Sequence, residues 1–93
     1  MEPKTIHDQI GRHKRVVLSS HARERMYERG ISEQDVLKAL KNPTQTGLLT
    51  VENRTRVRKN RKSNTPIDVV FTSDGEAITV ITAMTVATKG IGK

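Results

Sequence analysis

Residues 19–42 read SSHARERMYERGISEQDVLKALKN and predict two helices joined by a very short connection. The first helix is expected over His21–Arg29, behind two capping serines, and Gly30 ends it as glycine commonly does. The second helix begins at Ser32–Asp35, which is a capping box in its aspartate form, and ends at Asn42-Pro43. The stretch therefore predicts a helical hairpin.

The segments on either side of the hairpin are shorter and less regular. Before it, Ile6 and Ile10 have helical spacing, so a short helix is expected over Thr5–Ile10. Val16–Leu18 is an apolar run that is too short to assign. After the hairpin, β-prone stretches occupy residues 47–51, 54–58, 67–72 and 77–86, separated by a polar loop at 60–66 and a turn at 73–75.

The order of these elements predicts an α+β fold. N-terminal helices are expected to pack on a twisted antiparallel sheet of about four strands, with the long β-branched run at 77–86 as the central strand. The chain has 93 residues and is expected to form one domain over residues 1–93. Its ends, residues 1–5 and 88–93, are expected to be frayed.

The composition favours a polyanionic partner. Seventeen Lys and Arg against ten Asp and Glu give a formal net charge of +7, which points first to nucleic acid. The absence of Cys excludes disulfides and Cys-ligated zinc, and the two aromatic residues argue against modules that stack bases on aromatic platforms. With no signal peptide and no apolar run long enough to span a membrane, we expect a cytoplasmic protein without a membrane partner.

The strongest basic cluster lies in the predicted strand at 54–58 and in the loop that follows. Three arginines alternate with uncharged residues along the strand and so share one strand face. A basic strand face continued by a basic loop is typical of phosphate binding, whereas the alternative is a solvated edge that discourages aggregation. The cluster comprises Arg54, Arg56, Arg58, Lys59, Arg61 and Lys62.

His21 opens the first helix of the hairpin and shares one helical stripe with Arg25 and Arg29. Ala22 and Met26 lie on the adjacent flank and are expected to face the sheet, so the polar stripe borders the core. A histidine can move a 2′-hydroxyl proton near neutral pH, and an arginine can stabilise the charged phosphorane of RNA cleavage. The alternative is a capping or packed histidine beside a solvated arginine stripe.

Two further residue types bear on this site. The last predicted strand contains three threonines at every third position, Thr79, Thr82 and Thr85. Threonine is common in strands, but a hydroxyl beside a histidine and an arginine can also hydrogen-bond a phosphate. The three histidines are scattered and lack Cys or clustered carboxylate partners, so no metal site and no cofactor are expected.

Residues 20–32, read as SHARERMYERGIS, resemble the signature S-x-H-A-x-x-R-M-x-x-R-x-I-S of a family of small bacterial domains of unknown function. The capped helix after the motif also fits that family, and the resemblance covers roughly residues 6–84. The family is placed with the barnase, EndoU, colicin and RelE-like (BECR) ribonuclease fold. Many members of that fold are metal-independent endoribonuclease toxins, some of them paired with an antitoxin.

The resemblance also implies which residues would form the site. It points to His21 and Arg25 with Arg29 beside them, a basic residue from Arg54–Arg58, and a hydroxyl from the last strand. Related domains end with Ile-Thr-Val-Tyr. The matching threonine here is Thr79 or Thr82, and the tyrosine is present at neither position.

The first hypothesis is a metal-independent endoribonuclease of toxin type that yields a 2′,3′-cyclic phosphate. Its catalytic residues would be His21, Arg25, Arg56 and Thr82, and its nucleic-acid-binding residues Arg29, Arg54, Arg58, Lys59, Arg61 and Lys62. The partners would be RNA, free or ribosome-bound, and an antitoxin protein. The alternative is an inactive nucleic-acid-binding or ribosome-binding module of the same fold, and the third hypothesis is a small inhibitor of a protein partner. The substrate and the oligomeric state stay open.

Overall fold

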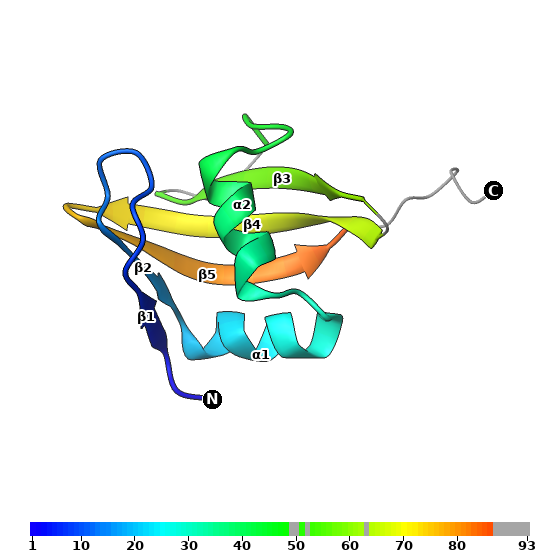
Figure 1. The fold of residues 1–93 in the computed structure, drawn as a ribbon, viewed down its shortest axis with the longest axis horizontal. Coiled ribbons are helices and arrows are strands. Elements are labelled where there is room, and N and C mark those ends of the chain that lie inside the picture. The colour runs from blue at the N-terminus through cyan, green and yellow to red at the C-terminus, as the bar shows by residue number, and fades with distance from the viewer. Residues whose placement is uncertain (49–50, 52, 63, 87–93) are drawn as a thin grey trace.

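The computed structural model describes residues 1–48, 51, 53–62 and 64–86, in which two helices pack on one face of a five-stranded sheet (Figure 1). The strand order across the sheet is β1-β2-β5-β4-β3. In chain order the elements are β1 (Lys4–Ile6), β2 (Arg15–Leu18), α1 (Ser20–Arg29), α2 (Glu33–Lys41), β3 (Thr55–Arg61), β4 (Asn64–Asp74) and β5 (Ala77–Thr85).

The sheet is mixed, which corrects the expectation of a wholly antiparallel one. β3, β4 and β5 pair antiparallel, and so do β1 and β2, but β2 and β5 run parallel at the junction of these two groups. Parallel neighbours require a crossover connection, and here both helices and the β3–β4 hairpin lie between them in the chain. The α+β class and the central position of β5 are confirmed.

The N-terminal segment forms a strand where a helix was expected over Thr5–Ile10. Lys4–Ile6 pairs with β2, and Ile10 forms an isolated bridge with His13. Two isoleucines at helical spacing are a weak signal, and in this chain both are instead placed by cross-strand pairing. Lys4 and Thr5, which belong to the segment expected to be frayed, pair with Leu18 and Val17 of β2, and residues 88–93 fall outside the described residues.

The helical hairpin agrees with its sequence signals. The Ser19 side chain accepts a hydrogen bond from the Ala22 backbone N–H at the start of α1, and Gly30 ends that helix with a φ of 66°. Ser32 and Asp35 form the expected reciprocal capping box of α2. Each capping interaction satisfies backbone groups that a helix end would otherwise leave without partners.

The β3–β4 hairpin is longer than its sequence predicts. The expected polar loop at 60–66 is wrong at both ends, because β3 runs to Arg61 and β4 begins at Asn64. The turn expected at 73–75 lies instead at Gly75 and Glu76, because β4 continues through Ser73 and Asp74; Gly75 has a φ of 58°. The predicted strand at 47–51 is absent at Gly47 and Leu48, and residues 49 and 50 lie outside the described residues.

The outer edge of β3 is partly paired by the segment that follows α2. The Thr44 and Gln45 backbone N–H groups both donate to the Arg58 carbonyl, and Arg58 N–H donates to Gln45 O at 2.9 Å. The Asn60 N–H donates to the Thr44 hydroxyl at 3.0 Å. These bonds occupy much of the β3 edge near its C-terminal end.

The core lies between the helices and one face of the sheet. α1 packs along β5, and α2 crosses β3 and β4 (Figure 1). Among the described helices, none is long and apolar enough to cross a membrane. The buried apolar side chains of these elements include Ala22 and Met26 of α1, Val36, Leu37 and Ala39 of α2, and Val16, Leu18, Val57, Ile67, Val69, Ile78 and Val80 of the strands.

Candidate functional site

None of the described helices or strands covers the sheet face opposite the helices, here called the uncovered face, and this face carries several of the predicted site residues. Ile67 and Val69 of β4 are fully buried beneath the helices. Because side chains alternate along a strand, Asp68 and Val70 point to the opposite face. The pairing of Arg58 with Asp68 and of Arg56 with Val70 puts both arginines on this same face.

A bulge in β5 places two of the predicted threonines on the uncovered face. Thr79 pairs with Thr72, but Thr82 pairs with Val70, because one extra residue of β5 is inserted between Val80 and Thr82. Without that insertion, two residues three apart would lie on opposite faces. Thr85 pairs with Ile67 and therefore lies on the helix side.

The bulge puts Thr82 in register with Arg56. Both residues pair with Val70 of β4, one from each side, so the three form a row across the uncovered face. Two strand spacings separate the Cα atoms of Arg56 and Thr82 by about 10 Å. Thr79 lies in a different row, beside Thr72. Of the two threonines that the sequence leaves open, Thr82 is the one aligned with Arg56.

The same bulge anchors the start of α1. Ser19 Oγ donates to the carbonyl of the bulge residue Ile81 at 3.2 Å, and the Ser19 N–H donates to Val80 O at 3.2 Å. Ser19 also caps α1, so one side chain joins the helix start to β5. His21 lies two residues beyond Ser19, and Thr82 follows Ile81 directly. The Ser19–Ile81 bond thus brings these two candidate residues into one neighbourhood.

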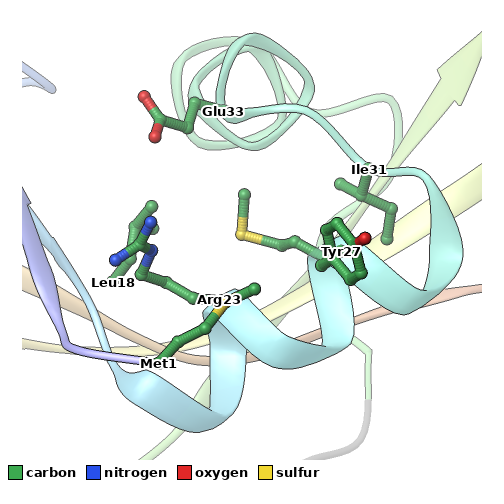
Figure 2. Close-up of a pocket in the computed structure, with 7 residues that line it drawn as sticks. Met1, Leu18, Arg23, Tyr27, Ile31 and Glu33 are labelled. Atoms are coloured by element: carbon green, nitrogen blue, oxygen red, sulfur yellow. The ribbon is translucent and has the colours of Figure 1, made fainter.

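The two flanks of α1 face different surroundings. Arg23 and Tyr27 border a small cavity of about 180 Å³ on the side where α2 begins, as Figure 2 shows together with Glu33. His21 and Arg25 each precede one of these residues by two positions and so lie roughly half a turn away. They are therefore on the flank of α1 that faces away from this cavity.

His21 and Arg25 differ in their local bonding. The His21 side chain is exposed at the first turn of α1. Arg25 is partly buried and donates from Nη1 to Glu28 Oε1 at 2.8 Å. The imidazole can therefore exchange protons with a ligand, whereas the guanidinium already shares its charge with a carboxylate on the same helix.

Asp68 is the residue of the candidate site that sequence reasoning missed. Its carboxylate is 0% exposed and accepts hydrogen bonds from Arg56 Nε at 2.7 Å and from Arg58 Nε at 2.7 Å and Nη2 at 3.0 Å. This cluster of Asp68, Arg56 and Arg58 is here called the Asp68 cluster. The available signal was an acidic residue inside the β-branched run 67–72, directly after a basic strand.

The Asp68 cluster holds its carboxylate ionised and its arginines in fixed orientations. Burial by itself would raise the pKa of Asp68, but the hydrogen bonds and charges of Arg58 and Arg56 together hold that pKa below its ordinary value. The hydrogen bond from Arg58 to Asp68 in turn raises the pKa of the Arg58 guanidinium. The arginine side chains keep 35% and 28% of their surface exposed, which leaves donor groups available at the surface.

The other predicted basic residues do not continue this surface. Lys59 pairs with Ile67 on the helix side, and its Nζ donates to Asn42 O at 2.8 Å. Arg61 also turns toward the helices and bonds to Asp35. The expectation of one basic face running through Arg54–Lys62 is therefore wrong. The remaining basic candidates, Arg29, Arg54 and Lys62, are exposed.

The described residues contain no group of three or more His, Asp or Glu side chains arranged to hold a metal ion. The candidate residues supply an imidazole, three guanidinium groups and a hydroxyl. Such groups can transfer a proton and bind an oxyanion.

Comparison with protein families gives a match over residues 18–85, to a domain of unknown function designated DUF4258. The matched segment begins at the last residue of β2 and ends with β5, so it contains the whole candidate site. No curated protein and no solved structure matches the chain.

Proposed function

The chain belongs to the DUF4258 family, and we propose that it is an RNA-directed endoribonuclease that works without a metal ion on the uncovered face. The observation that carries the proposal is the bulge at Ile81. It aligns Thr82 with Arg56 and, through Ser19, anchors the start of α1 next to them. This arrangement supports the proposal that His21 and Arg25 of α1 act together with Arg56 and Thr82 of the sheet.

The proposed reaction is an attack of the RNA 2′-oxygen on the adjacent phosphorus. His21 takes the proton from the 2′-hydroxyl, the new P–O bond forms, and the bond from phosphorus to the 5′-oxygen breaks. The leaving 5′-oxygen takes up a proton from solvent. The products are a 2′,3′-cyclic phosphate and a 5′-hydroxyl, with no change in oxidation state.

The charge that develops in this reaction lies on the non-bridging phosphate oxygens. Arg56 is held rigidly by Asp68 and keeps part of its guanidinium exposed, so it can bind such an oxygen without first being ordered. Arg25 supplies a second cation from α1, and the Thr82 hydroxyl supplies a neutral donor between them. These roles fit groups that must act on an anion.

Affinity for the RNA backbone is proposed to come from residues around this centre. Arg58, which belongs to the Asp68 cluster, lies next to Arg56 on the same face of β3. Arg29 is an exposed cation at the end of α1, and Arg54 is an exposed cation just before β3. The net charge of +7 attracts a polyanion from any direction. The packing of both helices on one face of the sheet, with no described element on the opposite face, also supports a BECR-like arrangement as part of this proposal.

The decisive experiment is cleavage of a mixed RNA pool by the purified chain in EDTA, with H21A alongside. We expect fragments that end in a cyclic phosphate from the native chain and none from H21A. H7A is the matched control, because His7 is also exposed but lies outside the site, and it should cleave normally. Cleavage by H21A at the native rate would overturn the assignment of His21. Intact free RNA would lead to the same assay on translating ribosomes.

A nucleic-acid-binding module without catalysis is the second candidate, and one observation favours it. Glu28 pairs with Arg25 and Asp68 pairs with Arg56, so two carboxylates reduce the positive charge available to a phosphorane. In that case RNA should bind with an affinity that falls steeply as salt rises, and H21A should bind as tightly as the native chain. An affinity that does not respond to salt would exclude this candidate.

A further inference from the structure

A second cavity lies on the helix side, between α2 and the β3–β4 hairpin. Its volume is about 470 Å³, within the range of pockets that hold small molecules. It is distinct from the uncovered face, because Lys59 and Arg61 reach it from the strand face that the helices cover. We call it the lysine pocket, and its lining residues are Asp35, Lys38, Lys59, Asn60, Arg61 and Lys62.

Arg61 and Asp35, at one wall of the lysine pocket, form an ion pair with each other. Arg61 Nη1 donates to Asp35 Oδ2 at 3.2 Å and to Gly30 O at 3.3 Å, and Arg61 Nε donates to Thr65 O at 2.8 Å. Asp35 also accepts from the Ser32 N–H. Arg61 and Asp35 therefore cancel in charge and serve the fold.

The remaining cations are three lysines. Within the part of the chain that the structure describes, no carboxylate forms an ion pair with Lys38, Lys59 or Lys62. Lys59 Nζ donates one hydrogen bond, to Asn42 O, and an ammonium group has three donors. The lining residues of the pocket thus carry a net charge of +3. The lysines have unused N–H donors, which come from α2 on one side and from the β3–β4 hairpin on the other.

We propose that the lysine pocket binds the phosphate chain of a di- or triphosphate. Three ammonium groups around one cavity match an anion of several charges, and lysine binds phosphate as a point charge rather than as a planar fork. A carboxylate would be better matched by a free guanidinium, and the only guanidinium among the described lining residues is the one already bonded to Asp35. This proposal does not depend on the ribonuclease assignment.

The test is calorimetric titration of the full chain with inorganic tripolyphosphate at fixed ionic strength. The double variant K38Q/K62Q should bind at least tenfold more weakly, because each lysine contributes a charge-assisted hydrogen bond. Lys59 is left intact because it also bonds to the end of α2. The matched control is K4Q/K14Q, which removes the same charge from exposed positions outside the pocket and should change the affinity less than threefold.

Three outcomes would overturn the proposal, and the first two concern the native chain and the two double lysine variants. One is the absence of tripolyphosphate binding by the native chain. The other is an equal loss of affinity in K38Q/K62Q and K4Q/K14Q, which would mean that only the overall charge attracts the anion. A third variant, R56Q/R58Q/D68N, alters the uncovered face. If this variant loses tripolyphosphate and K38Q/K62Q does not, the anion binds on the uncovered face and the lysine pocket is the wrong site.

Two RNA oligonucleotides of one sequence identify the source of the phosphate chain. A preference for a 5′-triphosphate end over a 5′-hydroxyl end, abolished in K38Q/K62Q, assigns the pocket to RNA ends. Equal binding of the two oligonucleotides, together with tripolyphosphate binding that K38Q/K62Q loses, assigns it to a free small anion. Both results support the lysine pocket and neither requires RNA cleavage.

Discussion

Two carboxylate–arginine sites in this chain are built in opposite senses. In the Asp68 cluster the acid is 0% exposed and its arginines are 35% and 28% exposed. At the lysine pocket Arg61 is 10% exposed and its acid, Asp35, is 27% exposed. A buried acid orients cations toward the surface, whereas a buried arginine joins backbone carbonyls inside the fold. The first arrangement suits the proposed ligand site, and the second joins α2 and the end of α1 to the β3–β4 hairpin.

The largest effect should come from removing both arginines of the Asp68 cluster. R56Q/R58Q leaves a fully buried carboxylate without a countercharge, and we expect the free energy of unfolding to fall by about 3 kcal/mol. Urea unfolding measures this loss. Adding D68N should restore much of it, since an amide is cheaper to bury than an unpaired charge. Native stability in R56Q/R58Q would show that Asp68 does not need its partners.

Arg61→Ala should be the next most damaging change. It removes hydrogen bonds to Gly30 O, Thr65 O and Asp35, and we expect a loss of about 2 kcal/mol in urea unfolding. R61K should recover little, because one ammonium cannot reach all three acceptors. RNA affinity should fall by about the same factor in R61A as in K14Q, a control variant that removes one exposed positive charge. A much larger fall would make Arg61 a ligand residue, contrary to its buried role.

The loss of stability at low pH should contain separate contributions from the carboxylates of Asp68 and Asp35. The folded-state pKa of Asp68 is below its ordinary value, so its stabilising contribution is fully present above the unfolded pKa of about 3.9. That contribution is lost as the pH falls through the folded pKa. D68N should lack this part of the acid-induced loss. Asp35 has the same sign of shift, because hydrogen bonds from Ser32 and Arg61 outweigh burial, so D35N is the comparison variant. Identical profiles for D68N and the native chain would contradict the assignment.

The smallest expected loss of stability comes from removing either of the two capping serines. S19A and S32A should each lose about 1 kcal/mol, since each serine caps one helix. Only Ser19 also bonds to the bulge at Ile81, so only S19A should lower RNA cleavage strongly. Cleavage rates of the two variants, measured where both are fully folded, provide the test. Equal rates would mean that the Ser19–Ile81 bond does not position His21.

The sequence predicted the elements whose signals are local. The capping box at Ser32–Asp35 and the glycine at Gly30 specify helix ends through neighbouring atoms, and both helices lie where these signals put them. The burial of Ala22 and Met26 also followed from helical periodicity. These features depend on residues within one or two turns of each other.

The features that the sequence did not predict depend on distant pairing. The parallel contact of β2 with β5 joins residues about sixty positions apart, and nothing in Val16–Leu18 indicates it. The bulge at Ile81 has no glycine or proline to mark it, yet it decides which threonine shares a row with Arg56. The burial of Asp68 likewise requires two arginines from another strand. Arg56 and Thr82 could be nominated from the sequence, but their position on a common face of the sheet could not.

The partly paired edge of β3 has a consequence for how the chain behaves at high concentration. Unpaired edge strands allow sheets to join edge to edge and aggregate. Thr44 and Gln45 fill the hydrogen-bonding positions around Arg58, and Asn60 is bonded to the Thr44 hydroxyl. The opposite edge of the sheet, β1, is only three residues long. A sheet rich in β-branched residues is thus partly protected at both edges against edge-to-edge polymerisation, and shortening the segment after α2 would remove that protection at one edge.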